Sequence, residues 1–360
     1  MRYIISIILI LSIAFGINSC KEDPAANTGI RIDVVAQNLT IPWGMGFLPN
    51  GDFIFCERNG NLNTIKKGET EVQTLLQRTI IPQGEGGLLG LAIDPQFSSN
   101  NYIYIYETAN NSNRVVRLRY MGGTVTEDAI IVANIPYATY HDGGGLAFGP
   151  DGYLYIGTGD ASVKENAQDI NSLSGKILRV DRDGNAAPGN PFSSRVWSYG
   201  HRNVQGFAWN PQGEMIATEH GPSGENGWQA HDEINHIIAG RNYGWPLVYG
   251  SMQSDTLEEP IYQSGNDTWA PSGIAYIQGS QWGAWQNTFV VGALKGERLI
   301  RFGVNANGTA NGMMSDTLQG EYRRLRNVIQ APDGSIYFCS SNTGNAPLAN
   351  DDKIYRMYVE

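Results

Sequence analysis

Six times along this chain, a short apolar run leads into a turn and then into a second apolar run. The first copy extends over residues 46–55 and turns at Pro49-Asn50-Gly51, and the third extends over residues 145–156 and turns at Pro150-Asp151-Gly152. Asn-Gly and Asp-Gly pairs favour the tight turns of β-hairpins, and the flanking Phe, Tyr, Ile and Val residues are typical of half-buried strands. Each copy therefore predicts a hairpin, and the copies begin at Phe47, Leu91, Leu146, Phe207, Ile274 and Val328.

The spacing of the copies, about 40–60 residues, fits one four-stranded sheet per copy. Helical periodicity is almost lacking, so the fold class is all-β. We expect a six-bladed β-propeller of four-stranded antiparallel blades around a central channel, because circular repetition protects the sheet edges. A pair of β-sandwiches is the alternative, and six copies of one pattern argue against it. The copies span nearly all of the 360 residues, which predicts one propeller domain over residues 31–360.

The N-terminus has the pattern of an export signal. Met1-Arg2 precedes an apolar stretch from Ile4 to Phe15, which is too short to span a membrane, and Ser19 precedes Cys20. This arrangement resembles a bacterial lipoprotein signal, in which residues 1–19 are removed, Cys20 is lipidated and residues 20–30 form a polar tether. We therefore expect a periplasmic or cell-surface protein that is anchored to the outer membrane through Cys20. Ordinary signal cleavage, with Cys20 incidental, is the alternative.

Charge and cysteine content limit the partners. The net charge of −10 argues against nucleic acid or an anionic lipid surface as the main partner, since both require a basic face. Membrane contact is expected only through the lipid anchor. Cys56 and Cys339 follow Gly51 and Gly334 by five residues in the first and last copies, which a closed ring makes neighbours. We favour two buried thiols over a disulfide, and no cysteine or histidine cluster suggests zinc.

One histidine lies where a ligand can reach it. His141 stands in the sequence Tyr140-His141-Asp142-Gly143-Gly144-Gly145, directly before the third copy. A loop that leads into an inner strand opens at the mouth of the channel, and glycines there allow a ligand to approach the backbone. Because its side chain titrates near neutrality, His141 is a candidate general base; a solvated loop histidine is the alternative.

Several of the 25 lysines and arginines lie beside predicted inner strands of different blades, namely Arg202, Lys295, Arg324 and Arg326. Inner positions converge on one axis, so these cations indicate an anionic ligand there, best one with several carboxylates. Scattered surface charge or salt bridges between blades are the alternatives. The segment from Glu219 to Tyr243 is rich in carboxylates, amides and Gly-Pro carbonyls, which suit Ca²⁺, although its spacing does not match an EF-hand.

Together these motifs resemble the soluble quinoprotein glucose dehydrogenase and aldose sugar dehydrogenase family. The resemblance covers residues 31–358 with the motifs in family order. They are Gly84-Glu85-Gly86-Gly87-Leu88-Leu89-Gly90, the His141 loop, Gly157-Thr158-Gly159-Asp160, Ser174-Gly175-Lys176-Ile177-Leu178-Arg179, Tyr199-Gly200-His201-Arg202-Asn203, Glu219-His220-Gly221-Pro222, Asp232-Glu233-Ile234-Asn235, Asn242-Tyr243-Gly244-Trp245-Pro246, Ala270-Pro271-Ser272-Gly273 and Arg324-Leu325-Arg326.

The resemblance implies a function. Members of the family are six-bladed propellers that bind pyrroloquinoline quinone (PQQ), a tricarboxylate, with Ca²⁺ over the channel. They oxidise aldose sugars at C1 to lactones by hydride transfer to the quinone, and an external acceptor then takes the electrons. By this resemblance His141 would be the general base, Asp160 would orient it, and Arg202 would lie near the reacting carbonyl of the quinone.

The same resemblance assigns residues to the cofactor and to calcium. The expected cofactor-binding residues, besides His141 and Arg202, are Glu85, Asn203, Thr268, Lys295, Arg324 and Arg326. The backbone carbonyls of Gly221 and Pro222 would bind the calcium that accompanies the cofactor. Glu233 and Tyr243 would support a second, structural calcium.

Some positions depart from the family pattern. Tyr140 stands where the glucose dehydrogenases carry Asp, and Thr268-Trp269-Ala270-Pro271 lacks an aromatic residue that flanks the cofactor there. The stretch from Ser223 to His231 is longer than in close relatives. These departures bear on substrate specificity and cofactor affinity. Two alternative functions follow: a non-catalytic sugar- or cofactor-binding lipoprotein, and a calcium-dependent lactonase.

Overall fold

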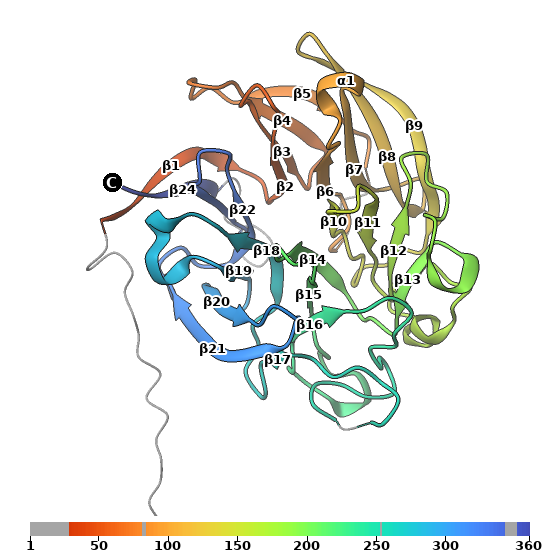
Figure 1. The fold of residues 1–360 in the computed structure, drawn as a ribbon. Coiled ribbons are helices and arrows are strands. Elements are labelled where there is room, and N and C mark those ends of the chain that lie inside the picture. Colours follow the sequence, from red (N-terminus) through yellow and green to blue (C-terminus); the bar gives the residue numbers. More distant parts are fainter. Residues whose placement is uncertain (1–28, 81–83, 253, 343–350) are drawn as a thin grey trace, which may run out of the picture.

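The computed structural model describes residues 29–80, 84–252, 254–342 and 351–360 (Figure 1). The expected signal peptide, Cys20 and most of the expected tether lie outside the described residues. In the described part of the chain, no helix has the length and apolarity needed to cross a membrane.

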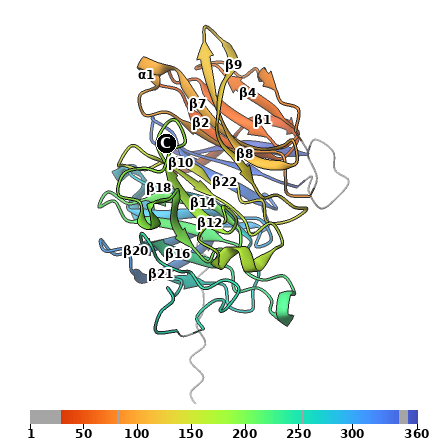
Figure 2. The ribbon, with the colours of Figure 1, turned by 90° about the vertical axis from the view of Figure 1, so that its right-hand side faces the viewer.

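The chain forms six four-stranded antiparallel sheets arranged around a centre (Figure 1), which confirms the predicted six-bladed propeller. Figure 2 shows the same blades from the side, where they overlap and loops extend beyond the strands. The blades consist, from the inner to the outer strand, of β2 (Pro42–Phe47), β3 (Phe53–Glu57), β4 (Asn61–Ile65) and β5 (Gln73–Gln77); β6 (Leu88–Ile93), β7 (Tyr102–Ala109), β8 (Ser112–Met121) and β9 (Thr124–Ile135); β10 (Leu146–Phe148), β11 (Leu154–Gly157), β12 (Lys176–Val180) and β13 (Val196–Tyr199); β14 (Val204–Trp209), β15 (Met215–Glu219), β16 (Glu233–Ile237) and β17 (Tyr262–Gln263); β18 (Pro271–Ile277), β19 (Thr288–Ala293), β20 (Arg298–Val304) and β21 (Ala310–Thr317); and β22 (Leu325–Gln330), β23 (Ile336–Ser340), β24 (Asp352–Val359) and β1 (Ile30–Leu39).

The six sequence copies are the two inner strands of the six blades. Gly51 and Gly334, at the first and last hairpin turns, have φ angles of 91° and 85°, which residues other than glycine rarely adopt. In the fifth copy the short turn is replaced by a 3₁₀ helix, Ser280–Trp285, whose Trp282 and Trp285 are buried in the core. The turn residues of the sequence therefore predicted the pairing of the two inner strands in the blades that keep a short turn.

The ring closes through the N-terminal strand. β1 pairs with β24 and forms the outer strand of the last blade, so both ends of the domain share one sheet. The buried carboxylate of Asp352, at the start of β24, accepts a hydrogen bond of 2.9 Å from the Ile41 N–H just ahead of β2. This contact joins the last blade to the first, and the sequence patterns did not predict it.

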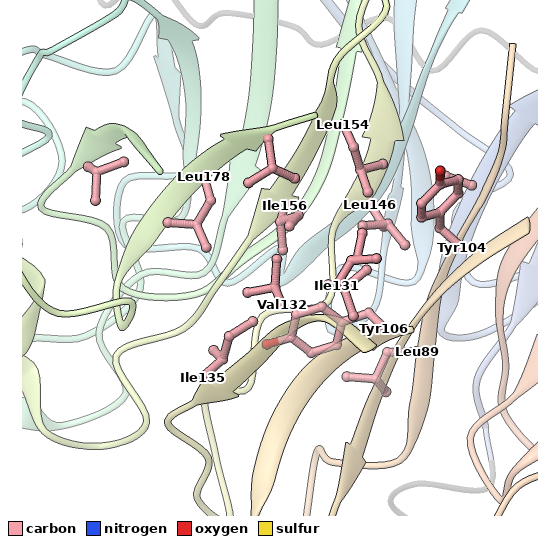
Figure 3. Packing of buried hydrophobic residues seen from close by; sticks show 14 of the residues in the cluster. Leu89, Tyr104, Tyr106, Ile131, Val132, Ile135, Leu146, Leu154, Ile156 and Leu178 are labelled. Carbon is pink, nitrogen blue, oxygen red and sulfur yellow. The ribbon is translucent and has the colours of Figure 1, made fainter. Parts of the chain in front are cut away.

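Apolar side chains fill the space between neighbouring blades. Figure 3 shows Leu89 and Tyr106 of the second blade close to Leu146 and Ile156 of the third. Each large side chain buried in this way stabilises the fold by roughly 1.5–3 kcal/mol. The Tyr106 hydroxyl also donates to the backbone carbonyl of Asp142 at 2.7 Å, which ties the His141 loop to the core.

Cys56 and Cys339 are separate, fully buried thiols. Burial raises the pKa of both, that of Cys339 to about 12, so neither forms a thiolate at neutral pH. They act as small apolar residues of the core. The single α-helix of the described residues, α1 (Phe97–Asn100), has only four residues.

Candidate functional site

One cavity collects side chains from all six blades. In an antiparallel hairpin, the start of the first strand and the end of the second lie at the same edge. Residues at these positions line a cavity of about 980 Å³ at one mouth of the channel. The lining residues that follow second strands include Arg58, Asp160, His220 and Lys295, and those that precede or begin first strands include Glu85, His141, Arg202, Arg324 and Arg326.

His141 forms a buried pair with Asp160. Its Nδ1 lies 2.7 Å from Asp160 Oδ1, and the Trp245 indole N–H and the Ser162 N–H hold the same carboxylate, each at 2.8 Å. A carboxylate only accepts hydrogen bonds, so the proton of the neutral imidazole is on Nδ1 and the lone pair is on Nε2. His141 is thereby prepared to accept a proton at Nε2.

The backbone around His141 is held in an unusual conformation. Its φ is 64°, and its N–H donates to Glu85 Oε2 at 2.8 Å. A Cβ at Gly159 would lie 1.8 Å from the His141 carbonyl oxygen, so only glycine allows this close approach. Asn203 supports the same loop, because its Oδ1 accepts from the Gly143 N–H at 2.9 Å and its Nδ2 donates to Glu85 at 3.2 Å.

Arg202 lies beside His141 and is buried, with an exposed fraction of 2%. Its Nη2 forms an ion pair of 2.6 Å with Glu225 Oε1, and its Nη1 donates to the His220 carbonyl at 3.2 Å. Its guanidinium also lies 5.4 Å from the ring centre of Trp245. Its Nε has no hydrogen-bond partner among the described residues, and neither does His220 Nε2. Unsatisfied buried polar atoms are rare in native proteins, and two of them belong to residues that line this cavity, which makes it a candidate binding site.

The cavity is also lined by the cations Arg58, Lys295, Arg324 and Arg326. Arg326 is buried and donates to Ser341 Oγ and Gln205 Oε1 at 3.1 and 3.3 Å. Burial and the adjacent Arg58 and Arg324 lower the pKa of Arg326 to about 9. Among the residues that the structure describes, neither Arg58 nor Lys295 forms a side-chain hydrogen bond or ion pair. With Arg324, four cations line this cavity, and such a cluster favours an anionic ligand.

Gly221, Pro222 and Thr268 line a smaller hollow of about 240 Å³ that adjoins the main cavity and shares His220 with it. Asp232 joins the two loops of this hollow, because it accepts from the Gly221 N–H at 2.8 Å and from the Trp269 N–H at 2.6 Å. Within the described ranges, no group of three or more His, Cys, Asp or Glu side chains is arranged to hold a metal. A cation at this hollow therefore requires backbone carbonyls and oxygens of the ligand.

Glu233 lies away from the cavity, at the start of β16. Its Oε1 accepts from the Gly250 N–H at 2.7 Å, and its Oε2 accepts from Asn235 at 3.1 Å. Burial, with nearby Glu219 as a smaller cause, raises the pKa of Glu233 to about 8, and the buried Asn235 Oδ1 has no partner among the described residues. Closely spaced buried carboxylates beside an unpaired amide oxygen are the donor chemistry that Ca²⁺ prefers. The Tyr243 hydroxyl is satisfied by His236 O and the Ile238 N–H, so this side chain offers no free donor atom.

Comparisons with known proteins found relatives that cover most of this chain. The family model described as "Glucose / Sorbosone dehydrogenase" matches residues 39–349. Aldose sugar dehydrogenase YliI of Escherichia coli is 30% identical over 90% of this chain and 93% of its own length. The PQQ-bound aldose sugar dehydrogenase of Streptomyces coelicolor is 37% identical, with a TM-score of 0.82 over 92% of this chain and 98% of that chain.

This chain belongs to the glucose/sorbosone dehydrogenase family. It is homologous to aldose sugar and glucose dehydrogenases over most of its length, as the motifs from Gly84 to Arg326 had indicated. A further relative, quinoprotein glucose dehydrogenase B of Acinetobacter calcoaceticus, is 24% identical over 89% of this chain and 87% of its own length.

The site of this family member contains most of the residues expected from its sequence. The structure brings seven of them to the main cavity, namely Glu85, His141, Asp160, Arg202, Lys295, Arg324 and Arg326. Asn203 lies directly behind this cavity, and Thr268, Gly221 and Pro222 line the adjoining hollow. Glu233 and Tyr243 are outside both spaces.

Sequence reasoning also missed side chains of the cavity, among them Arg58, His220 and Glu225. Arg58 directly follows β3, and His220 directly follows β15. Both therefore stand immediately after the second strand of a blade, and this position could have identified them from the sequence. Applied to every blade, this rule selects both. Glu225 lies in the long stretch after Pro222, where no local pattern predicts the path of the chain.

Proposed function

We propose that this protein oxidises aldose sugars at C1 to the lactone, with PQQ and Ca²⁺ as cofactors and an external electron acceptor. The observation that carries the proposal is the buried His141–Asp160 pair, which lines the same cavity as a group of four cations. The Streptomyces relative, a PQQ-bound aldose sugar dehydrogenase, supports it.

The residues present fit a tricarboxylate quinone. Arg58, Lys295, Arg324 and Arg326 supply positive charge to the cavity, and arginine suits carboxylates because its planar group donates two parallel hydrogen bonds. The pKa of Arg326 is lowered mainly by burial and also by repulsion from Arg58 and Arg324, and a bound carboxylate would relieve that repulsion. The cavity, at about 980 Å³, is in the range that accommodates a cofactor-sized ligand.

Each catalytic side chain has a distinct role in this proposal. When bound, the quinone supplies an acceptor for the C1 hydrogen with its electron pair, and calcium supplies a Lewis acid. His141 Nε2 accepts the proton of the C1 hydroxyl, and Asp160 stabilises the imidazolium that results. Arg202 lines the same cavity and stabilises negative charge that develops on oxygen. Glu85 and Asn203 hold the His141 loop in place.

We assign the two proposed calcium sites different properties. The carbonyls of Gly221 and Pro222 are neutral, so calcium there requires anionic oxygens from the cofactor. Glu233, with the Asn235 amide oxygen close by, is the centre of the second site, which binds calcium without cofactor. Because burial raises the pKa of Glu233 to about 8, calcium binding there would release a proton. Tyr243 would contribute to the second site through its backbone, because its hydroxyl is already used.

We also propose that the mature protein begins at a lipidated Cys20 and is anchored at the periplasmic or outer face of the outer membrane. The small residue before Cys20 and the apolar stretch ahead of it support this proposal. Mass spectrometry of the mature N-terminus tests it. A diacylglyceryl adduct on Cys20 is expected, and an unmodified Cys20 in a soluble fraction would contradict it.

A single-turnover measurement tests the proposed activity. Protein loaded anaerobically with PQQ and Ca²⁺ is mixed with one equivalent of an aldose, and the absorbance of the quinone is followed. We expect stoichiometric reduction of the quinone and one equivalent of lactone. A stable quinone spectrum with every aldose tried would refute the proposal.

A further inference from the structure

The segment from Ser223 to His231 forms a compact loop over the cavity. Glu225–Gly227 is a short 3₁₀ turn, the Gly224 N–H donates to the Trp228 carbonyl at 2.8 Å, and Ser223 pairs with Gln229 in a β-bridge. The Ser223 N–H also donates to Glu225 Oε2 at 2.5 Å. The loop therefore fixes the Glu225 side chain through its own backbone.

Aromatic packing attaches this loop to the wall of the site. Trp228 stacks on Tyr249 with ring centres 4.4 Å apart and an angle of 28° between the ring planes. Its ring centre also lies 6.4 Å from that of Trp245 in an edge-on arrangement. The Trp245 indole N–H also donates a hydrogen bond to Asp160. The loop therefore packs against the same side chain that positions the His141–Asp160 pair.

The carboxylate of Glu225 lies between the two proposed catalytic side chains. Its Oε1 is 2.6 Å from Arg202 Nη2 and 3.8 Å from His141 Nε2. Partial burial disfavours the charge of Glu225, but Arg202 outweighs this effect and holds its pKa below the ordinary value. Glu225 therefore presents an ionised acceptor next to the atom that removes the substrate proton, and the side chain remains partly exposed to the cavity.

We propose that Glu225 is a specificity-determining residue that binds the hydrogen-bond donor on the carbon next to the oxidised carbon of the sugar. This inference rests on the proposed function. A C1 hydroxyl hydrogen-bonded to His141 Nε2 places the substituent on C2 within reach of a carboxylate 3.8 Å from that nitrogen. An ionised carboxylate only accepts hydrogen bonds, so it favours a sugar with a hydroxyl on C2 and favours an ammonium group there more strongly. It forms no hydrogen bond with a C2 that carries only hydrogen.

The test compares three sugars that differ only at C2: D-glucosamine, D-glucose and 2-deoxy-D-glucose. We measure kcat/KM for the quinone- and calcium-loaded wild type, Glu225→Gln and Glu225→Ala. Loss of a charge-assisted hydrogen bond typically costs about ten- to a hundred-fold. We expect Glu225→Gln to lower the ratio of glucosamine to 2-deoxyglucose by about tenfold, and Glu225→Ala to abolish the preference for glucose over 2-deoxyglucose.

Glu165→Gln is the matched control, since Glu165 lines the same cavity and, within the described residues, has no ion pair with His141 or Arg202. It removes the same charge and should leave all three ratios unchanged. Equal changes in the kcat/KM ratios of the Glu165 and Glu225 variants would overturn the proposal, because the loss of any negative charge in the cavity would then explain them. Unchanged ratios in Glu225→Gln together with tighter quinone binding would also overturn it, since Glu225 would then only block the cofactor.

The same experiment separates this inference from the proposed function. If the loaded wild type oxidises none of the sugars, the proposed function fails, and the specificity proposal fails with it. If the wild type oxidises them and the Glu225 variants keep its ratios, only the role of Glu225 is refuted. Thermal unfolding of each variant confirms that the loop change leaves the fold intact.

Discussion

Replacing Asp160 by asparagine tests the catalytic pair without changing the size of the side chain. Asp160 is almost fully buried, with an exposed fraction of 1%, and its two oxygens accept from three donors. Oδ1 accepts from His141 Nδ1 and the Ser162 N–H, and Oδ2 accepts from the Trp245 indole. Asparagine offers only one acceptor oxygen, so its amide group must face a donor on one side.

Both orientations of the introduced amide impair the base. If the NH₂ group faces His141, the imidazole proton moves to Nε2 and the lone pair no longer faces the substrate. If it faces Trp245, a buried indole N–H loses its acceptor, at a cost of about 1–3 kcal/mol, and the imidazolium loses its counter-charge. Either way we expect kcat to fall by roughly 10²–10⁴-fold. Quinone affinity should change by less than about threefold, because both carboxylate oxygens are engaged by the protein.

Stopped-flow reduction of the quinone gives the chemical step, and fluorescence titration gives the affinity. The control is Asp169→Asn, an exposed carboxylate that lies nine residues further along the chain. It should retain wild-type kcat. A value of kcat within tenfold of wild type in Asp160→Asn would refute the reasoning, because His141 would then need no carboxylate partner.

Three further results are expected. Arg326→Met, which removes a cation from the cavity wall, should weaken quinone binding at least about tenfold by fluorescence titration, and a change below threefold would contradict its role. Burial raises the pKa of Asp142 to about 6, so the native state binds an extra proton between the unfolded and folded pKa values. The free energy of unfolding should therefore fall by about 2 kcal/mol as the pH rises from 4 to 6. Urea unfolding at stepped pH should show this slope in the wild type but not in Asp142→Asn. Chelation should lower the melting temperature of the cofactor-free protein. Calcium at a hundred times its dissociation constant should restore about 2.7 kcal/mol of unfolding free energy, and Glu233→Ala should show neither effect.

The blades could be predicted from the sequence because their information is local. Each hairpin is specified by its turn residue, such as Gly51 or Gly334, and by the apolar runs on either side. These residues lie within a few positions of the paired strands that they specify. Pairing of β1 with β24 is different, since it joins residues near opposite ends of the chain, such as Ile30 and Val359. No local pattern specifies such a partner, so the sequence predicted a ring without showing how it closes.

The sequence predicted those residues of the site that lie in recognisable motifs at the ends of strands. His141, Asp160 and Arg202 lie at strand ends within recognisable motifs, and the structure brings them together. Glu225 enters the cavity because Trp228, three residues later, stacks on Tyr249 from a distant loop. That contact depends on the three-dimensional arrangement of the fourth blade, which the spacing of residues along the chain does not contain.

Steady-state turnover is the most direct test of the central claim. Purified protein is mixed with PQQ, Ca²⁺, a panel of aldoses and a redox dye, and the product is identified by NMR. The account predicts dye reduction that requires both quinone and calcium, formation of the C1 lactone, and a loss of at least about a hundred-fold in His141→Ala. No dye reduction with any aldose, or hydrolysis of lactones without quinone, would contradict it.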